Sequence, residues 1–338
     1  MVSQKIIDKW YSQHVSWLLI PLSGLFFLVI TIRRWLYKKH FLPISSLPVP
    51  VIVVGNITVG GTGKTPLVIA LCNWLKTQGY YPGVISRGYK GQINQVHVVS
   101  HEDGPSLVGD EPLLIFKEAA VPVAIGKNRY QAGVELLKKY PEINIILSDD
   151  GLQHYALQRN LEIVVVDGQR LLGNTYLLPA GPLREPQSRL STVDAVVING
   201  ENESLLDNRQ SQFNMTMRPE TWINVNNPHL RQPINAFSSE RCVAMCAIGN
   251  PQRFLNTLAS IGVVPFATRI FEDHYHYQEN DFKEWLDEKI LMTEKDGIKC
   301  HLFAPQNVWM LKISAQLDEP FYQWLQVKLT HLRENNGF

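Results

Sequence analysis

The sequence feature that most constrains the fold is the run VIVVGNITVGGTGKTP at residues 51–66. There an apolar strand leads through a glycine-rich loop into a helix, which is the context of a phosphate-binding loop. In such a loop Lys64 reaches the β- and γ-phosphates of a nucleoside triphosphate, and the Thr65 hydroxyl can ligate Mg²⁺. The run therefore predicts a nucleotide site formed by Thr58, Val59, Gly60, Gly61, Thr62, Gly63, Lys64 and Thr65.

One position departs from the usual pattern, G-x-x-x-x-G-K-[ST], in which the first glycine would fall at position 58. Here that position is Thr58, and the adjacent pair Gly60 and Gly61 can compensate. Glycines matter in this loop because they let the backbone approach phosphate and turn its N–H groups inward. The alternative is a chance glycine-rich turn before a helix, which the preceding strand and the GKT ending disfavour.

Short apolar runs alternate with helical stretches from residue 48 to about residue 200. After the strand at 51–54, a helix is expected over 64–78, with Gly79 ending it. Further strands are expected at 84–86, 96–99, 121–125, 143–147, 163–166 and 195–198. Several of these runs are continuously apolar, which is typical of parallel strands covered on both faces. The pattern predicts a P-loop NTPase-like α/β domain with a doubly wound parallel sheet.

The second half of the chain predicts a smaller α/β domain. Residues 201–240 are polar and lack periodicity, so we expect a boundary or a loosely ordered connection there. A strand at 243–248, a turn at 249–251 and a helix to about residue 261 then follow, with more strands at 289–292 and 308–313 and a terminal helix at 321–332. The 338 residues suggest about two domains. We divide the chain into residues 1–46, 47–200 and 201–338.

Composition excludes several classes of protein. Hydrophobic residues make up 45% of the chain and charged residues 19%, which excludes a disordered chain. The net charge of +1 provides no field that would recruit nucleic acid. The four cysteines match no zinc or disulfide pattern, and Cys242 and Cys246 flank an apolar run where packed thiols are expected. A reducing, cytosolic environment follows.

The most apolar stretch of the chain is the 18-residue segment 15–32. That length is at the lower limit for spanning a hydrocarbon core of about 30 Å, and Pro21 should kink the segment. Basic residues, rather than a cleavage site, follow it (Arg33, Arg34, Lys38 and Lys39), which disfavours a secretory signal. We expect an apolar helix or kinked helical pair embedded in, or lying on, the cytoplasmic leaflet. A core helix of the soluble domain and a full membrane span are the alternatives.

Acidic residues supply the other candidate site groups. Asp149 and Asp150 follow the apolar run 143–147 and Ser148, as in a Walker B strand whose carboxylates hold Mg²⁺. An Asp-Asp-Gly turn is the alternative, and without the phosphate loop it would be equally consistent. Asp110, in GDEP at 109–112, suits a helix N-cap by its spacing, or a carboxylate that accepts a proton from an attacking hydroxyl. A regulatory GTPase is disfavoured because the D-x-x-G spacing is missing and TEKD at 293–296 only partly resembles its base-reading motif.

Two histidines stand two residues apart in the segment FEDHYH at 271–276. If the segment is extended, His274 and His276 face the same way, as two ligands of one metal ion would. An exposed loop is the other interpretation.

Several blocks together resemble one family. They are VGNITVGGTGKTP, SRGYKG at 86–91, GDEP, SDDGLQHY at 148–155, LLPAGPLREP at 177–186, DH at 273–274 and MTEKDGIKC at 292–300. This set, which extends over nearly the whole chain, is similar to that of the tetraacyldisaccharide 4′-kinases, the lipid A 4′-kinases of Gram-negative bacteria. The threonine at position 58 is shared by that family.

The resemblance implies transfer of phosphate from ATP, with Mg²⁺, to the 4′-hydroxyl of a tetraacylated glucosamine disaccharide 1-phosphate. It places the reaction at the cytoplasmic face of the bacterial inner membrane, with a smaller domain closing on the phosphate-loop domain. It assigns Asp110 as general base, with His274 as its partner, beside Lys64. It places Glu111, Asp149, Asp150 and Gln153 around Mg²⁺ and nucleotide, and Arg87, Tyr89 and Arg129 at the disaccharide.

Two other functions compete with this interpretation. One is a soluble small-molecule kinase or ligase of the phosphate-loop class, whose N-terminal segment belongs to the core. The other is a partner-regulated switch ATPase with no phosphoryl acceptor except water. The sequence indicates no nucleic-acid partner and no obligate protein partner.

Overall fold

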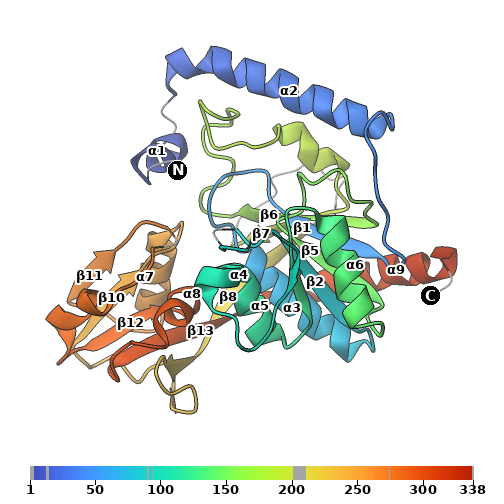
Figure 1. The fold of residues 1–338 in the computed structure, drawn as a ribbon. Helices are drawn as coiled ribbons and strands as arrows, with labels where there is room; N and C mark the ends of the chain where they lie inside the picture. Colours follow the sequence, from blue (N-terminus) through green and yellow to red (C-terminus); the bar gives the residue numbers. More distant parts are fainter. Residues whose placement is uncertain are drawn as a thin grey trace.

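The structure is a computed structural model that describes residues 4–12, 15–89, 91–93, 95–200, 211–273 and 275–336. Within these residues one sheet runs through the molecule in the order β11-β10-β12-β13-β8-β7-β6-β1-β5-β2-β4-β3, with β9 paired to β8 (Figure 1). Its strands are β1 Val51–Gly55, β2 Pro82–Ser86, β3 His97–Val98, β4 Val123–Ile125, β5 Ile145–Asp149, β6 Leu161–Asp167, β7 Ala195–Asn199, β8 Gln212–Asn224, β9 Arg231–Gln232, β10 Cys242–Cys246, β11 Ala267–Ile270, β12 Lys289–Thr293 and β13 Val308–Leu317.

Helices flank the sheet and precede it. They are α1 Gln4–Tyr11, α2 Ile20–Lys38, α3 Lys64–Thr77, α4 Pro105–Val108, α5 Asp110–Ala119, α6 Arg129–Lys139, α7 Pro251–Ser260, α8 Glu294–Cys300 and α9 Glu319–Asn336. Short 3₁₀ helices lie at Trp17–Leu19, Gln187–Thr192, Glu279–Asp281 and Lys283–Trp285.

The first part of the sheet is a doubly wound parallel sheet, as predicted. Strands β4, β2, β5, β1, β6 and β7 are parallel to their neighbours, and only β3 at the edge is antiparallel. Alternate residues of β1 point to opposite faces, so Ile52 packs with α3 and α5, whereas Val53 packs with α6 and the loops beyond it. Burial on both faces explains why these strands are continuously apolar.

The connection expected at residues 201–240 contains a long strand, so that expectation is wrong for the described residues from 211 onward. Strand β8 pairs in parallel with β7 and antiparallel with β13, and it joins the two parts of the chain in one sheet. Proline inside a run argues against a strand, and β8 contains Pro219. The structure places Pro219 at an irregularity, where the partner register shifts between Lys312 and Ile313. A bulge tolerates the missing backbone donor.

The second part of the sheet is a smaller α/β unit. Strands β11, β10, β12 and β13 are parallel, with α7 packed on one face and the segment from Tyr277 to Phe282 and residues of α8 on the other. The predicted strands near 243, 289 and 308 are confirmed. Cys242 and Cys246 are buried and free, as expected for packed thiols.

The terminal helix α9 packs on the core of the first part. Phe321, Leu325 and Leu329 are buried among side chains of α3 and the sheet, and the Phe321 ring contacts Phe213 of β8. Residues from both halves of the chain therefore build the first core. The division of the chain at residue 200 stays a prediction. Both β8 and α9, which follow that residue, pack against strands that precede it.

Helix α2 lies along the outside of the molecule (Figure 1). Most of its large apolar side chains are solvent-exposed, the others are half-buried, and Ser23 alone among its residues is buried. The stretch Trp17–Lys38 is long and apolar enough to cross a membrane. Only 6% of its most apolar 18-residue segment is buried, whereas a core helix would be mostly buried. The core-helix alternative is therefore wrong. The expected kink is also absent from the helix, because Pro21 sits in the first turn, where its missing N–H removes no intrahelical bond.

We predict that Leu325→Ala lowers the free energy of unfolding by about 2–5 kcal/mol, because a buried leucine of α9 leaves a cavity. Val327→Ala is the matched control: Val327 lies on the same helix but is 56% exposed, so its change should stay within about 0.5 kcal/mol. Urea unfolding followed by circular dichroism measures both. Equal effects would show that α9 does not contribute to the core.

Candidate active site

The phosphate loop joins β1 to α3 in the predicted context. Gly63 caps α3 with a φ of 99°, and an added Cβ there would lie 2.2 Å from Nδ2 of Asn199, so only glycine is tolerated. Asn199, at the end of β7, donates from Nδ2 to the Thr62 carbonyl at 2.8 Å. The Val59 amide donates to the Pro182 carbonyl, and Tyr11 of α1 donates to the Val59 carbonyl. The loop is thus held from three sides in one conformation.

Thr58 departs from the usual pattern without distorting the loop. It is 2% exposed and forms an isolated β-bridge with Leu183. Its φ is not positive, so the position does not require glycine. The positive φ of 115° falls instead at Gly60. The compensation expected from the Gly60-Gly61 pair is consistent with this geometry.

A network of opposite charges surrounds Asp150, which follows β5. Its carboxylate lies 3.5 Å from Lys64 Nζ and 3.3 Å from Arg184 Nη1. Burial by itself would raise the pKa of Asp150, but Lys64, Arg184 and Arg129 outweigh burial and lower that pKa well below its usual range. Asp150 is therefore ionised at neutral pH. It holds the Lys64 ammonium beside the phosphate loop.

Asp149 is the last residue of β5, and it pairs in register with Val54 of β1. Its side chain is 1% exposed, and Oδ2 accepts a hydrogen bond from Ser86 Oγ at 3.2 Å. Burial, helped by Glu111 and Asp150, raises the pKa of Asp149 to about 7, against the opposing effects of Lys64 and Arg129. Its Oδ1 is buried with no hydrogen-bond partner among the described residues. A cation bound next to Oδ1, in addition to the nearby Lys64 and Arg129, would give this oxygen a partner.

Asp110 and Glu111 begin α5, at the edge of the same site. The N-cap of α5 is Gly109, with a φ of 94°, and no side chain caps the helix. The expectation that Asp110 is the N-cap is therefore wrong: Asp110 is the first residue of the helix itself. An added Cβ at Gly109 would lie 2.9 Å from the Tyr89 carbonyl oxygen. The close approach of these two loops therefore requires glycine at position 109, directly before the first residue of α5.

Two lysines of α8 reach these acids from the second part of the chain. Lys295 Nζ lies 3.2 Å from Glu111 Oε1 and 3.8 Å from Asp273 Oδ1. Lys299 Nζ lies 3.8 Å from Asp110 Oδ2 and 3.0 Å from Asp296 Oδ1. Burial would lower the pKa of Lys295, but the three carboxylates of Glu111, Asp273 and Asp110 outweigh it and raise that pKa, so Lys295 stays protonated. Two lysines of the sequence block 292–300 therefore contact the acidic residues of the candidate site.

The second part also contacts the phosphate loop directly. The Gly249 carbonyl accepts a hydrogen bond from Arg170 Nη1 at 2.9 Å, and an added Cβ at Gly249 would lie 3.0 Å from the Gly61 nitrogen. Arg253 of α7 forms an ion pair of 3.0 Å with buried Asp167 at the end of β6. The two parts of the chain therefore meet at the phosphate loop as well as at α5.

The residues predicted to contact the disaccharide occupy different positions. Arg87 and Tyr89 follow the carboxyl end of β2 and are exposed. Arg129 is only 3% exposed and donates to the carbonyls of Gly126, Asp149 and Asp150, so it braces the turn after β5. Burial lowers the pKa of Arg129 to about 10, yet it remains charged at neutral pH. Their contact with substrate stays a prediction.

Gln153 ties the turn after β5 to two other segments. Its Nε2 donates to the Asn56 carbonyl and to Glu185 Oε1, both at 3.0 Å. The neighbouring His154 is partly buried, which, together with nearby arginines such as Arg129 and Arg159, lowers its pKa to about 4. His154 is therefore neutral at physiological pH.

His274 lies outside the described residues, so the predicted pairing with Asp110 and the shared orientation of His274 and His276 stay predictions. On either side of it, Asp273 contacts Lys295 and Tyr275 stacks on Phe271 with ring centroids 4.4 Å apart. His276 is exposed. The segment therefore approaches the α8 lysines.

The donor set suits Mg²⁺ rather than a metal held by protein alone. Among the described residues no three His, Cys, Asp or Glu side chains gather closely enough to hold a metal ion. Mg²⁺ usually binds through one or two carboxylates, phosphate oxygens and water. The unpartnered, buried Oδ1 of Asp149 is an oxygen of this kind.

Sequence reasoning missed several residues of the site. They are Asn56, Arg184, Glu185, Asn199, Lys295 and Lys299. Asn56 follows β1 directly and is fully buried with both side-chain polar atoms unpartnered among the described residues, and its place after the strand is the signal that could have identified it. No spacing rule points to the two lysines, since Lys295 lies 184 residues from Glu111 and Lys299 lies 189 residues from Asp110.

Comparisons with known proteins agree with this geometry. The family model of the tetraacyldisaccharide-1-P 4′-kinases, LpxK, matches residues 15–330. The tetraacyldisaccharide 4′-kinase of Methylobacillus flagellatus is 46% identical over 328 residues, covering 96% of each chain. That of Shewanella pealeana is 44% identical over 332 residues, covering 97% of this chain and 98% of its own. A crystal structure of LpxK from Aquifex aeolicus in complex with ATP has a TM-score of 0.79 and 32% identity, covering 91% of this chain and 97% of that one. The resemblance seen in the sequence blocks is confirmed, and the chain belongs to the tetraacyldisaccharide-1-P 4′-kinase family.

Proposed function

We propose that this chain transfers the γ-phosphate of ATP to the 4′-hydroxyl of a tetraacylated disaccharide 1-phosphate, the reaction that its family name states. The observation that carries the proposal is the convergence of two groups of side chains. Lys64 at the start of α3 contacts Asp150 after β5, Glu111 of α5 is close enough to help raise the pKa of Asp149, and lysines of α8 contact Asp110 and Glu111. The ATP complex of the Aquifex aeolicus relative supports ATP as the phosphate donor.

The chain's own residues supply positioning and charge. The loop amides around Gly60–Gly63 cradle the phosphates, and Lys64 neutralises negative charge on the β- and γ-phosphates. Asp150 and Arg184 hold Lys64 in place, which preserves its geometry during transfer. The transition state of phosphoryl transfer is loose, so such positioning and charge neutralisation contribute most of the rate.

Asp110 is proposed as the general base. A carboxylate with a reference pKa of about 3.9 is a weak base for a sugar hydroxyl, but a loose transition state requires little proton removal early in the reaction. Lys299 is 3.8 Å from Asp110 Oδ2 and is itself buried, so it fixes the orientation of the carboxylate. His274 is proposed as a further partner of Asp110, on the family resemblance alone.

Mg²⁺, when bound, would neutralise the negative charge that develops on the phosphate oxygens. We propose that it is held by Asp149 and the Thr65 hydroxyl, with Glu111, Asp150 and Gln153 close by. The raised pKa of Asp149 supports this role, because a buried carboxylate that is costly to ionise alone is stabilised by a neighbouring cation. Arg87, Tyr89 and Arg129 are proposed for the disaccharide side of the site.

We further propose that α2 lies on the cytoplasmic face of the bacterial inner membrane. Its exposed side chains include Leu22, Leu25 and Leu28, and an exposed apolar patch of this kind is typical of a surface that contacts a membrane or another protein. Ser23 donates to the Leu177 carbonyl and accepts from the Ala180 amide, which fixes one face of α2 to the globular part. A helix held in this way is suited to lie in the interface rather than to span the bilayer. An acylated substrate at the same surface is then within reach.

The proposed activity is tested by a phosphate-transfer assay. Incubated with radiolabelled ATP, Mg²⁺ and the tetraacyl disaccharide 1-phosphate in detergent micelles, the protein should yield a lipid with one additional phosphate. Lys64→Ala should reduce the transfer rate roughly 10²–10³-fold by removing charge stabilisation. Thermal unfolding of the variant serves as the control for folding. ATP hydrolysis without a labelled lipid would favour a switch ATPase, and transfer to a soluble acceptor alone would favour a small-molecule kinase.

Asp110→Asn separates catalysis from ion pairing. The carboxamide cannot accept the proton, so kcat should fall roughly 10²–10⁴-fold while KM for ATP changes little. Steady-state kinetics with varied ATP and saturating lipid acceptor measure both. A near-normal kcat would reduce Asp110 to a structural partner of Lys299.

The proposed membrane contact is tested by charge on the exposed face of α2. Leu25→Asp combined with Leu28→Asp should abolish co-sedimentation of the protein with phosphatidylcholine vesicles, because burying the new charges in the bilayer is costly. The matched control is Val264→Asp with Leu302→Asp, two exposed apolar residues elsewhere, which should leave binding intact. Loss of binding in both pairs, or in neither, would contradict the role of α2.

A further inference from the structure

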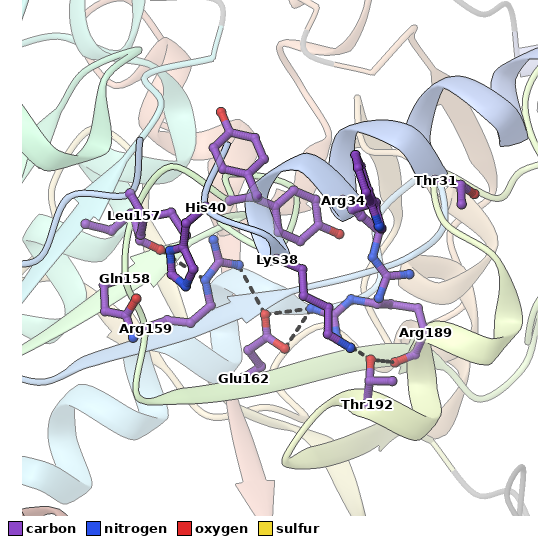
Figure 2. Close-up of a pocket in the computed structure, with 14 residues that line it drawn as sticks. Thr31, Arg34, Lys38, His40, Leu157, Gln158, Arg159, Glu162, Arg189 and Thr192 are labelled. Atoms are coloured by element: carbon purple, nitrogen blue, oxygen red, sulfur yellow. Dashed lines mark hydrogen bonds and ion pairs between the residues drawn. The ribbon is translucent and has the colours of Figure 1, made fainter. Parts of the chain in front are cut away.

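A cavity of about 510 Å³ lies between the carboxyl end of α2 and the globular part (Figure 2). One wall comes from α2 and the residues after it, including Arg34, Lys38 and His40. The other comes from the segment after β5, the start of β6 and the 3₁₀ helix Gln187–Thr192. None of the residues assigned above to ATP, Mg²⁺ or the disaccharide lines this cavity.

The floor of the cavity is a rigid, internally neutralised network. Glu162 accepts from Arg159 at 3.1 Å and from Arg189 at 2.6 Å. Arg189 also forms an ion pair with buried Glu185 at 3.2 Å, and it donates to Thr192 at 2.6 Å. These two arginines and two glutamates balance one another in charge. Their positions are fixed by the contacts, so the floor is pre-formed.

The wall on α2 carries positive charge without such balance. Arg34 and Lys38 line the cavity four residues apart, on one side of the helix, and no ion pair joins either of them to a described carboxylate. Figure 2 shows both side chains extending from α2 toward the side of the cavity that carries Arg189 and Thr192. The cavity therefore has a net positive wall above a neutral polar floor.

We propose that this cavity binds the phosphate headgroup of an anionic membrane phospholipid. The charge of Arg34 and Lys38 is complementary to a phosphate, and a basic pocket beside a membrane-associated helix is a known mode of headgroup recognition. The apolar side chains of the same helix, such as Leu28 and Ile32, are exposed and can contact the acyl chains of the same lipid. A bound headgroup would fix the rotation of α2 at the membrane surface.

The inference uses the proposed location of α2 but not the proposed kinase activity. A binding experiment without nucleotide or acceptor therefore tests it separately. The full-length protein is titrated with vesicles of phosphatidylcholine alone and with vesicles that also contain phosphatidylglycerol, and binding is measured by co-sedimentation. We compare Arg34→Gln/Lys38→Gln with the matched pair Arg33→Gln/Lys39→Gln. The second pair removes the same charge from the same helix end, but neither of its residues lines the cavity.

Arg34→Gln/Lys38→Gln should weaken binding to the anionic vesicles roughly thirtyfold, since each basic residue near an anionic surface contributes about a fivefold gain in affinity. Binding to neutral vesicles and the melting temperature should not change. The control pair should lose affinity only at low salt, where general attraction to the surface is unscreened. In high salt the cavity pair alone should remain weaker, and soluble glycerophosphoglycerol should remove that difference by competition.

Two results would overturn the proposal. Equal losses for the two pairs at every salt concentration would reduce Arg34 and Lys38 to a diffuse basic surface. A raised KM of Arg34→Gln/Lys38→Gln for the tetraacyl disaccharide 1-phosphate in detergent without phospholipid would assign the cavity to the phosphate of the substrate instead. Failure of the kinase assay in the unmodified protein would leave the vesicle results interpretable, because they require no turnover.

Discussion

The rest of the structure depends on the parallel pairing of β1 with β5. Their register sets Val54 beside Asp149, so both strands end at the same edge of the sheet. The phosphate loop leaves one strand and the Asp149–Asp150 turn leaves the other, which brings Lys64 within 3.5 Å of Asp150. Neither charge would be stable there alone, because burial disfavours the charged form of an isolated group. Lys64, Arg184 and Asp150 compensate one another, and this compensation holds the lysine at the site where a triphosphate would bind.

The second part of the chain completes this site rather than forming an independent unit. Strand β8 continues the sheet from β7 to β13, and α9 returns to pack on the first core. Through this arrangement α8 packs against α5, and its two lysines contact Asp110 and Glu111. Gly249 at the same time approaches Gly61 of the phosphate loop. Any motion of the second part would therefore change the surroundings of the acidic residues and of the loop together.

The face of the molecule that carries α2 is built differently from the sheet edge. Helix α2 exposes apolar side chains outward and is fixed to the globular part by Ser23 and by the Tyr37–Tyr155 ring contact. Tyr155 also donates to Glu185, which accepts from Gln153 at the edge of the active site. A short chain of hydrogen bonds thus connects the wall of the cavity under α2 with the turn after β5.

The sequence by itself determined the elements whose signals are local. The strand–loop–helix unit at Lys64, the continuously apolar parallel strands, the apolar helix and the family blocks all depend on residues close together in the chain. The tertiary structure decided the remainder. Strand β8 lies in a polar segment without sustained periodicity, so only its pairing with β7 and β13 reveals it, and only that pairing shows that Pro219 sits at an irregularity. The sequence favoured Asp110 as a helix cap, and the structure shows that Gly109 is the cap instead, because its positive φ begins the helix. Lys295 and Glu111 are 184 residues apart, and their contact follows from the order of strands in the sheet, which no local pattern encodes.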